Sequence, residues 1–387
     1  MSIGFVYHPR ENINSRIVGK GGTDIVWLTP QTDKLEHTFY VLDIYNTLLL
    51  HPNYITNIPE DVLQKLCTGE WHLLIDCIEE YDIYKLGTYK NSKWPLQQHM
   101  IMNTGLGRLV NFCNFLWDNY KIPHNHVHYS SSFLYDKKML SKLKDMNVTT
   151  DINFHFRDVF LTIYSKNTIN VSQSRNEKYL YSALNAGDPK APKVDMIYQL
   201  WKNDLLGDGL VSLSNLKKYI PKMCQKEFIE LLPIRSNFTN KHWWLTSEDR
   251  QKSELKELQD VRIYISTETL APNNYCFITE KTYRSIAYKK PFIIVGNKSS
   301  LQKLRDLGFE TFDKWWSEEY DTLDWSERID WTIKFLKWMK KTKPIFNGIE
   351  KVTEHNYDHM MNTKWQEMFK TSLVNAKKQL TKHRKML

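Results

Sequence analysis

The sequence lacks the features that mark several large classes of protein. No run approaches the ~18–20 apolar residues that cross a bilayer, and no apolar segment follows a basic start. We therefore expect a cytoplasmic protein, in the host cytoplasm if the chain is viral. There is no internal repeat and no low-complexity segment, which argues against a solenoid or a disordered chain. The five cysteines are odd in number and show no CxxC spacing, which favours reduced thiols.

What the chain does contain is an excess of positive charge and many aromatic rings. The formal net charge of +9 favours anionic partners, such as nucleotides, nucleic acid or an acidic membrane face, although a merely basic surface would give the same number. Aromatic residues make up 13% of the 387 residues. Neighbouring rings such as Trp243–Trp244 and Trp315–Trp316 point in different directions, so we expect part of this surface to line a cleft.

Short apolar runs alternate with longer amphipathic stretches, which predicts an α/β fold with parallel sheets and crossover helices. The length of the chain suits two such domains. A polar stretch at 165–177 is the expected boundary, giving a first domain over 1–172. In this half we expect strands at 38–41, 71–75 and 127–130, a helix at 109–120, and either a strand or a helix end at 159–164.

The second half follows the same pattern and ends in helices. We expect a second domain over 173–345 and a helix with a basic tail over 346–387. The expected strands are 178–184, 210–213, 261–266 and 292–295. The expected helices are 194–205, 226–232, 279–288, 299–307, 331–341 and 363–379.

The segment 263–296 has the clearest chemical logic. Thr279 is a good N-cap, and Glu280 and Lys281 follow in the first helical turn, where backbone N–H groups and the helix dipole attract phosphate. Lys281 and Arg284 are three residues apart, so both can clamp a diphosphate, and Glu280 can accept two ribose hydroxyls. The plainer alternative is that Thr279 and Glu280 only cap a helix while the two cations are solvated.

This segment resembles the donor-binding motif of the α1,3-fucosyltransferase family and of related glycosyltransferases with two Rossmann-like domains (the GT-B fold). The matching residues are Glu268, Phe277, Thr279, Glu280, Lys281, Pro291 and Gly296, in order and in approximate spacing. The resemblance implies that Glu280 binds the ribose and Lys281 the diphosphate of a nucleotide-sugar. Thr269 and Lys289–Lys290 depart from the family pattern, so GDP-fucose is not assumed as the donor.

The flanks of the motif extend this resemblance over roughly residues 178–325. The segments 178–193 and 308–321 are similar to parts of phage and bacterial relatives, and they add Asn185, Lys190 and Lys193 to the expected donor site. We see no Asp-x-Asp motif in a convincing place, which favours a metal-independent enzyme that needs no cofactor beyond its nucleotide-sugar co-substrate.

An inverting transferase needs a general base for the acceptor hydroxyl. Asp76 ends an expected strand, and Glu79 and Glu80 follow it, so Asp76 and Glu80 are the candidate catalytic carboxylates. The same pattern would arise if Asp76 only capped a helix and the two glutamates lay in solvent. Whether the reaction inverts or retains configuration is open, because both outcomes occur on this fold.

Histidines alternate at His124, His126 and His128, which raises the question of a metal site. No cysteine lies nearby and no acidic ligand completes the set, so we expect no metal. We place His128 in the acceptor site instead, together with Trp243 and Trp244, whose rings can stack on a base.

The favoured acceptor is a hydroxymethylated pyrimidine in double-stranded phage DNA. Lysines are dense at 334–343 and 377–385, where they can bind phosphates. A glycan, lipid-linked sugar or protein acceptor is an equal alternative, because the same lysines fit the solvent-exposed faces of amphipathic helices. A non-catalytic nucleic-acid-binding protein with a transferase-like fold would explain the charge but not the grouping of Glu280, Lys281 and Arg284. The oligomeric state is open.

Overall fold

The computed structural model describes residues 3–7, 37–44, 58–77, 105–131, 151–165, 177–185, 191–213, 224–234, 258–268 and 276–386. The chain forms two compact units. Unit 1 contains Met1–Val159 together with Lys364–Leu387, and unit 2 contains Phe160–Thr363. These units differ from the expected domains in two ways. The boundary between them falls after Val159 and not after 172, and Lys364–Leu387 belongs with unit 1.

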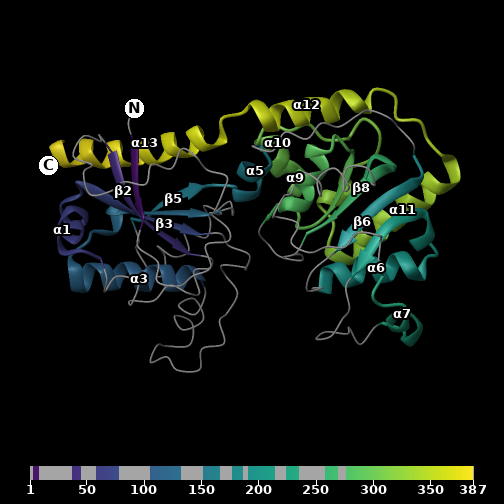
Figure 1. The fold of residues 1–387 in the computed structure, drawn as a ribbon, viewed down its shortest axis with the longest axis horizontal. Coiled ribbons are helices and arrows are strands. Elements are labelled where there is room, and N and C mark those ends of the chain that lie inside the picture. The colour runs from purple at the N-terminus through teal and green to yellow at the C-terminus, as the bar shows by residue number, and fades with distance from the viewer. Residues whose placement is uncertain are drawn as a thin grey trace. The chain divides into compact units, whose positions relative to one another are not determined.

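Unit 1 is built on a five-stranded parallel sheet in the order β1-β2-β3-β4-β5 (Figure 1). Its strands are β1 (Ile3–Tyr7), β2 (His37–Ile44), β3 (Trp71–Cys77), β4 (Val127–Ser131) and β5 (Asn153–Phe156). Its helices are α1 (Glu60–Thr68), α3 (Gly105–Tyr120) and α13 (Trp365–Met386), with a short 3-10 turn at His124–His126. Helix α5 (Val159–Tyr164) begins at the boundary with unit 2.

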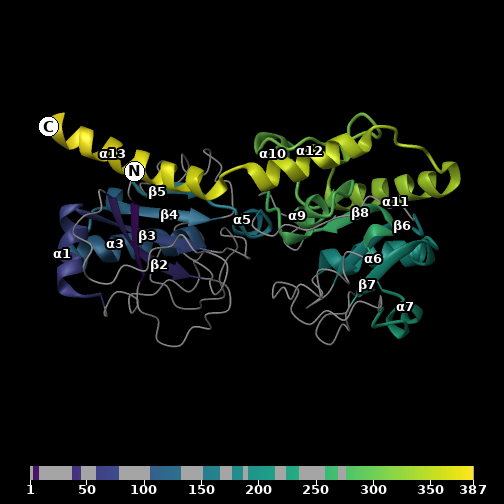
Figure 2. The ribbon, with the colours of Figure 1, turned by 45° about the horizontal axis from the view of Figure 1, so that its top comes forward.

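Side-chain alternation along the strands gives this sheet two buried faces. On one face, Tyr40, Leu42, Leu73 and Ile75 form a core with apolar residues of α1 and α3. On the other face, the alternate residues Phe39, Val41 and Leu74 pack against Phe369 and Leu373 of α13. Figures 1 and 2 show α3 and α13 on opposite sides of the sheet. This apolar contact explains why the last helix belongs with unit 1.

A chain of hydrogen-bonded histidines crosses the α13 face of the sheet. His72 Nδ1 lies 2.7 Å from His128 Nε2, and His128 Nδ1 lies 2.8 Å from His155 Nε2. His155 Nδ1 then lies 2.8 Å from Ser372 Oγ of α13. We call these three residues the histidine ladder. Burial lowers the pKa of His155 to about 4 and holds that of His128 well below its usual value, so both histidines are neutral at pH 7.

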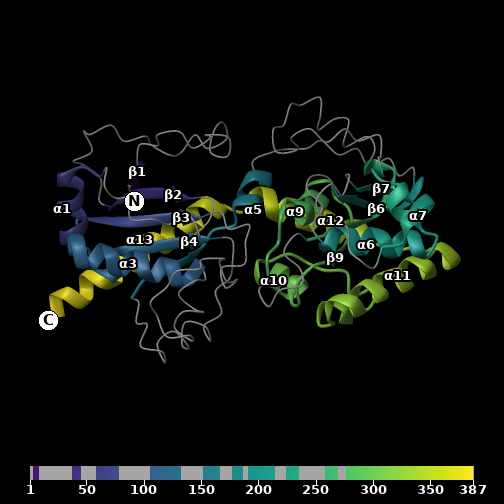
Figure 3. The ribbon, with the colours of Figure 1, turned by 90° about the horizontal axis from the view of Figure 1, so that it is seen from below.

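Unit 2 is built on a four-stranded parallel sheet in the order β7-β6-β8-β9. Its strands are β6 (Tyr179–Asn185), β7 (Gly209–Leu213), β8 (Val261–Thr267) and β9 (Phe292–Val295). Its helices are α6 (Ala191–Lys202), α7 (Lys226–Glu230), α9 (Glu280–Ala287), α10 (Ser300–Asp306), α11 (Trp325–Thr342) and α12 (Ile349–Asn362). Helices α6 and α11 contact each other and the sheet, whereas α9 contacts α12 (Figures 1 and 3).

The expected α/β fold, with two parallel-sheet units and a helical C-terminal region, is confirmed. The segment 159–164, left open between strand and helix, is helical. Trp316 corrects the expectation of cleft-lining rings: it is 6% exposed and stacks on Phe312 in the core. All five cysteines are free thiols. Among the helices in the described parts of the chain, none combines the length and apolar character needed to cross a bilayer.

Acid should destabilise unit 1 through the histidine ladder. The folded pKa of His155, about 4, lies below its ordinary value of 6.5, so its contribution to stability is complete above pH 6.5 and is lost as the pH falls toward 4. We expect the free energy of unfolding to drop by on the order of 2 kcal/mol per such histidine between pH 7 and pH 5. Urea unfolding followed by tryptophan fluorescence at both pH values measures the change.

The variant His155→Gln keeps a hydrogen-bonding side chain but does not titrate, so its stability should depend less on pH than that of the wild type. His355→Gln, which changes an exposed histidine of α12, is the matched control and should behave as the wild type does. An unchanged pH dependence in His155→Gln would contradict the assignment.

Candidate functional site

The candidate site lies at the carboxyl edge of the unit 2 sheet, between β6 and β8. From β6 the chain crosses to β7 on one side, and it then returns to place β8 on the other side of β6. In open α/β sheets, ligands bind where the strand order reverses in this way. Helices α6 and α9 follow these two strands, and both begin near this edge.

The start of α9 is tied to the end of β8 by a buried carboxylate. Glu268 accepts hydrogen bonds from the Thr279 backbone N–H at 3.1 Å, the Thr279 hydroxyl at 2.5 Å and the Thr282 hydroxyl at 2.8 Å. Thr279 is the N-cap of α9. A Cβ added to Gly296 would lie 3.1 Å from Glu268 Cγ, so the glycine leaves room for this side chain. Glu268, expected to contact the donor, instead has partners that position the helix.

Charged side chains gather just beyond this cap. Lys281 Nζ donates to Glu280 Oε1 at 2.7 Å and to Thr279 Oγ1 at 3.0 Å. Burial alone would raise the pKa of Glu280, but the charges of Lys281, Arg284 and Lys193 lower it below its ordinary value. Burial opposes the charge on Lys281, yet Glu280 and Glu268 raise its pKa. Glu280 and Lys281 are therefore both ionised at neutral pH.

The five side chains of this charged cluster are Lys193, Glu268, Glu280, Lys281 and Arg284, none more than 8% exposed. Lys193, Lys281 and Arg284 surround Glu280, and each of these cations lowers its pKa. Burial and the neighbouring Glu280 raise the pKa of Glu268. Cations grouped at the start of a helix suit a phosphate or another anionic ligand.

The remaining expected donor residues fall partly within this site. Lys193 lies in the first turn of α6 and is 6% exposed. Asn185 is the last residue of β6, and its backbone N–H donates to Ser212 Oγ at 3.2 Å. Lys190 lies outside the described residues. The structure thus brings together six of the eight expected donor residues around the charged cluster and places Asn185 on the adjoining strand.

In unit 1 the candidate base has two partners. Asp76 is 6% exposed, accepts a hydrogen bond from Ser130 Oγ at 2.6 Å and forms an ion pair with Arg157. We expected Asp76 to end this strand, and it lies one residue before the end of β3. Glu80, the second candidate, lies outside the described residues.

His128 does not suit the acceptor role expected of it. Its side chain is fully buried, and both ring nitrogens are engaged by His72 and His155. Trp243 and Trp244 lie outside the described residues. Within the described ranges, no group of three or more His, Cys, Asp or Glu side chains has the geometry to hold a metal ion.

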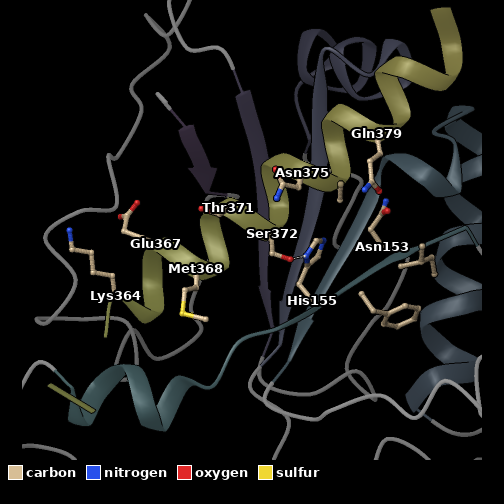
Figure 4. A pocket seen from close by; sticks show the side chains of 12 residues that line it. Asn153, His155, Lys364, Glu367, Met368, Thr371, Ser372, Asn375 and Gln379 are labelled. Carbon is tan, nitrogen blue, oxygen red and sulfur yellow. Dashed lines mark hydrogen bonds between the residues drawn. The ribbon is translucent and has the colours of Figure 1, made fainter. Parts of the chain in front are cut away.

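A groove of about 910 Å³ lies elsewhere, between β5 and α13 of unit 1 (Figure 4). Figure 4 shows the hydrogen bond from His155 to Ser372 at its floor, with Asn153, Asn375 and Gln379 nearby. The groove is lined by residues of unit 1, and the charged cluster is formed by residues of unit 2.

Two residues of these sites were missed by sequence reasoning. Thr282 binds a carboxylate 14 positions away, and Arg157 pairs with one 81 positions away. No local pattern marks a residue whose role depends on a distant partner. Thr282 does stand three residues after the cap, on the same side of the helix, which is the one signal that could have drawn attention to it.

No protein-family model and no curated protein matches the chain. Among solved structures, it is similar to the DNA-modifying enzyme beta-glucosyltransferase, at 12% identity, covering 97% of this chain and 100% of that one with a TM-score of 0.42. It is also similar to T4 phage beta-glucosyltransferase in a second structure, at 11% identity, covering 96% and 99% of the two chains with a TM-score of 0.39. With identities and scores this low, function has to be argued from the site itself.

The structure predicts that Glu268→Ala destabilises unit 2. The change removes three hydrogen bonds to a buried carboxylate and leaves donors of α9 without their acceptor, which should cost about 3 kcal/mol. Urea unfolding at pH 7.5 measures the loss. Glu227→Ala, which truncates an exposed glutamate of α7, is the control and should lie within about 0.5 kcal/mol of the wild type. Equal stability of the two variants would contradict the role given to Glu268.

Proposed function

We propose that the chain is a glycosyltransferase that binds a nucleotide-diphosphate-sugar at the carboxyl edge of β6 and β8 and transfers the sugar to an acceptor hydroxyl. The observation that carries this proposal is the buried charged cluster at the start of α9, where three cations gather around Glu280. Cations at a helix start favour phosphate, and the strand-order reversal is where α/β folds bind nucleotides.

A diphosphate fits the cluster better than a singly charged group. Lys193 comes from the first turn of α6, and Lys281 and Arg284 come from α9, so cations reach the site from two helices. A diphosphate carries several oxygen acceptors and at least two negative charges that these groups can share. As the bond to the sugar breaks, negative charge grows on the leaving diphosphate, and fixed cations stabilise it without a metal ion.

Glu280 has a different part in the proposal. A carboxylate offers only acceptors, so it repels phosphate and binds hydroxyl groups. Lys281, Arg284 and Lys193 keep it ionised. We assign it to the ribose hydroxyls of the nucleotide, the role that the motif resemblance gives it. Lys281 then has two roles in the proposal: it holds Glu280 in place, and it binds the diphosphate.

For the general base we retain Glu80. Asp76 is held by Ser130 and Arg157, and a carboxylate paired with a guanidinium is a weak base. In the sequence, Glu80 comes three positions after the end of β3, and open α/β domains carry functional groups beyond the carboxyl ends of their strands. Activity of Glu80→Gln, compared with Asp76→Asn, distinguishes the two assignments.

For the acceptor we propose a hydroxymethylated pyrimidine in DNA. The support is charge: the chain has a net charge of +9, and Lys334 and Lys341 are exposed two turns apart on α11. Not every lysine of this region contributes, because Lys340 pairs with Asp208 and Lys377 is buried, with its pKa lowered by burial to about 8. A glycan or protein acceptor is the competing outcome of the same assays.

Binding of nucleoside diphosphates tests the donor site. We expect UDP or GDP to bind the wild type, with Lys281→Ala and Arg284→Ala each weakening the affinity about 10- to 100-fold by removing a charge-assisted hydrogen bond. Isothermal titration calorimetry measures this. Lys314→Ala, an exposed lysine of the same unit, should bind as the wild type does. A wild type that binds DNA but neither nucleotide would overturn the transferase and leave the non-catalytic nucleic-acid-binding protein.

DNA affinity as a function of salt tests the acceptor. The double variant Lys334→Ala/Lys341→Ala should reduce the slope of log K against log salt by about 2, because each phosphate contact contributes about 0.9. Fluorescence anisotropy with a hydroxymethylated duplex gives the slope. Lys351→Ala, an exposed lysine of α12, is the control. If the slope of log K against log salt is unchanged, and parallel assays show sugar transfer to a glycan, the acceptor is a glycan and not DNA.

A further inference from the structure

Several buried polar side chains of β6 and β8 have no hydrogen-bond partner, and two of them stand at the strand ends beside the charged cluster. Asn185 ends β6, and Thr267 ends β8. Each is 1% exposed. Neither the amide oxygen nor the amide nitrogen of Asn185 is bonded, and neither is the hydroxyl of Thr267. Buried polar groups are nearly always hydrogen-bonded, so an unbonded pair at the ends of two adjacent strands calls for a physical reason.

Strand register places the two side chains on one face of the sheet, at the ends of neighbouring strands. β6 and β8 are parallel, with Tyr181 opposite Ile263. Asn185 and Thr267 each lie four residues further along, and side chains two or four apart on a strand share a face. Tyr181 on that face donates its hydroxyl hydrogen to Leu205 O, just after α6. Asn185 and Thr267 therefore lie on the α6 side of the sheet.

The neighbouring residue Glu268 points to the opposite face, where it binds the start of α9. The two faces of the sheet edge thus differ in chemistry. The α9 side presents Glu280, Lys281 and Arg284, which are charged. On the α6 side, the strand ends present an amide and a hydroxyl, which are neutral and carry both donors and acceptors, and Lys193 of α6 adds one cation.

This difference in chemistry selects different parts of one ligand. A diphosphate offers only acceptors and many charges, and cations bind it best. A sugar ring is neutral, and each of its hydroxyls both donates and accepts, which matches an asparagine amide and a threonine hydroxyl. We propose that Asn185 and Thr267 bind hydroxyl groups of the transferred sugar and contribute to the choice of sugar. This inference rests on the proposed function.

The test compares each nucleoside diphosphate with its sugar conjugate. The probes are UDP with UDP-glucose, and GDP with GDP-fucose and GDP-mannose, titrated by calorimetry into the full chain. Asn185→Ala and Thr267→Val should bind the bare diphosphate within twofold of the wild type, but the sugar conjugate about 5- to 50-fold more weakly. Lys281→Ala should weaken both ligands alike.

Ser182→Ala is the matched control. Ser182 lies on the same strand, is fully buried, and has a hydroxyl without a partner, but it lies on the opposite face from Asn185. It should bind both ligands as the wild type does. The ligand-free stability of Thr267→Val gives a second readout: an unbonded hydroxyl contributes nothing to folding, so urea unfolding should show equal or greater stability.

The outcomes separate the inference from the function on which it rests. If the wild type binds none of the diphosphates, the proposed function fails. If it binds them, but the two variants lower the affinities for diphosphate and conjugate equally, or lower neither affinity, the inference is overturned and the proposed transferase function stands. A clear loss of stability in Thr267→Val would show a structural role and would also overturn it. If Asn185→Ala does not fold, Asn185→Leu, which keeps a similar volume and removes the hydrogen-bonding groups without adding a charge, replaces it.

Discussion

The geometry of the candidate site depends on the contact between Glu268 and the start of α9. A single carboxylate at the end of β8 accepts three hydrogen bonds from Thr279 and Thr282, and these bonds fix both the position and the rotation of the helix. Because Glu280, Lys281 and Arg284 lie within the first turns of α9, their direction follows from that rotation. Gly296 belongs to the same arrangement, since a larger residue would press against Glu268.

The charge of the cluster follows from this arrangement. Two carboxylates buried at one helix terminus would repel each other, and Lys281 lies close enough to both to counter that repulsion. Arg284 and Lys193 add positive charge beside Glu280 and lower its pKa further. Burying this many ions is costly, because each ion loses its hydration. A role for the cluster in holding a ligand would explain why the fold accepts that cost.

The sequence predicted the elements whose patterns are strong and local. β9 is an uninterrupted apolar run and was expected with the bounds that it has, and the cap of α9 was read from Thr279. β5 was missed because its four residues, NFHF, alternate polar and aromatic side chains without a longer context. α12 was missed because its N-cap is Gly348, which gives no side-chain signal. The partners of Glu268 and Asp76 depend on tertiary contacts that no local pattern contains.

The histidine ladder of unit 1 and the polar side chains at the edge of β6 and β8 differ in whether the protein itself supplies their hydrogen-bond partners. In the sequence, the histidine ladder of unit 1 looks like a functional site, because histidines alternate along a short segment. In the structure, its ring nitrogens bond to one another from His72 through His128 to His155, and His155 bonds to Ser372 of α13. Its chemistry is satisfied within the protein, so it serves packing. At the edge of β6 and β8, cations gather around Glu280, and Asn185 and Thr267 are left unbonded. Unbonded buried polar groups do not stabilise a fold, and their place beside a charged cluster at a strand-order reversal supports the proposed ligand site.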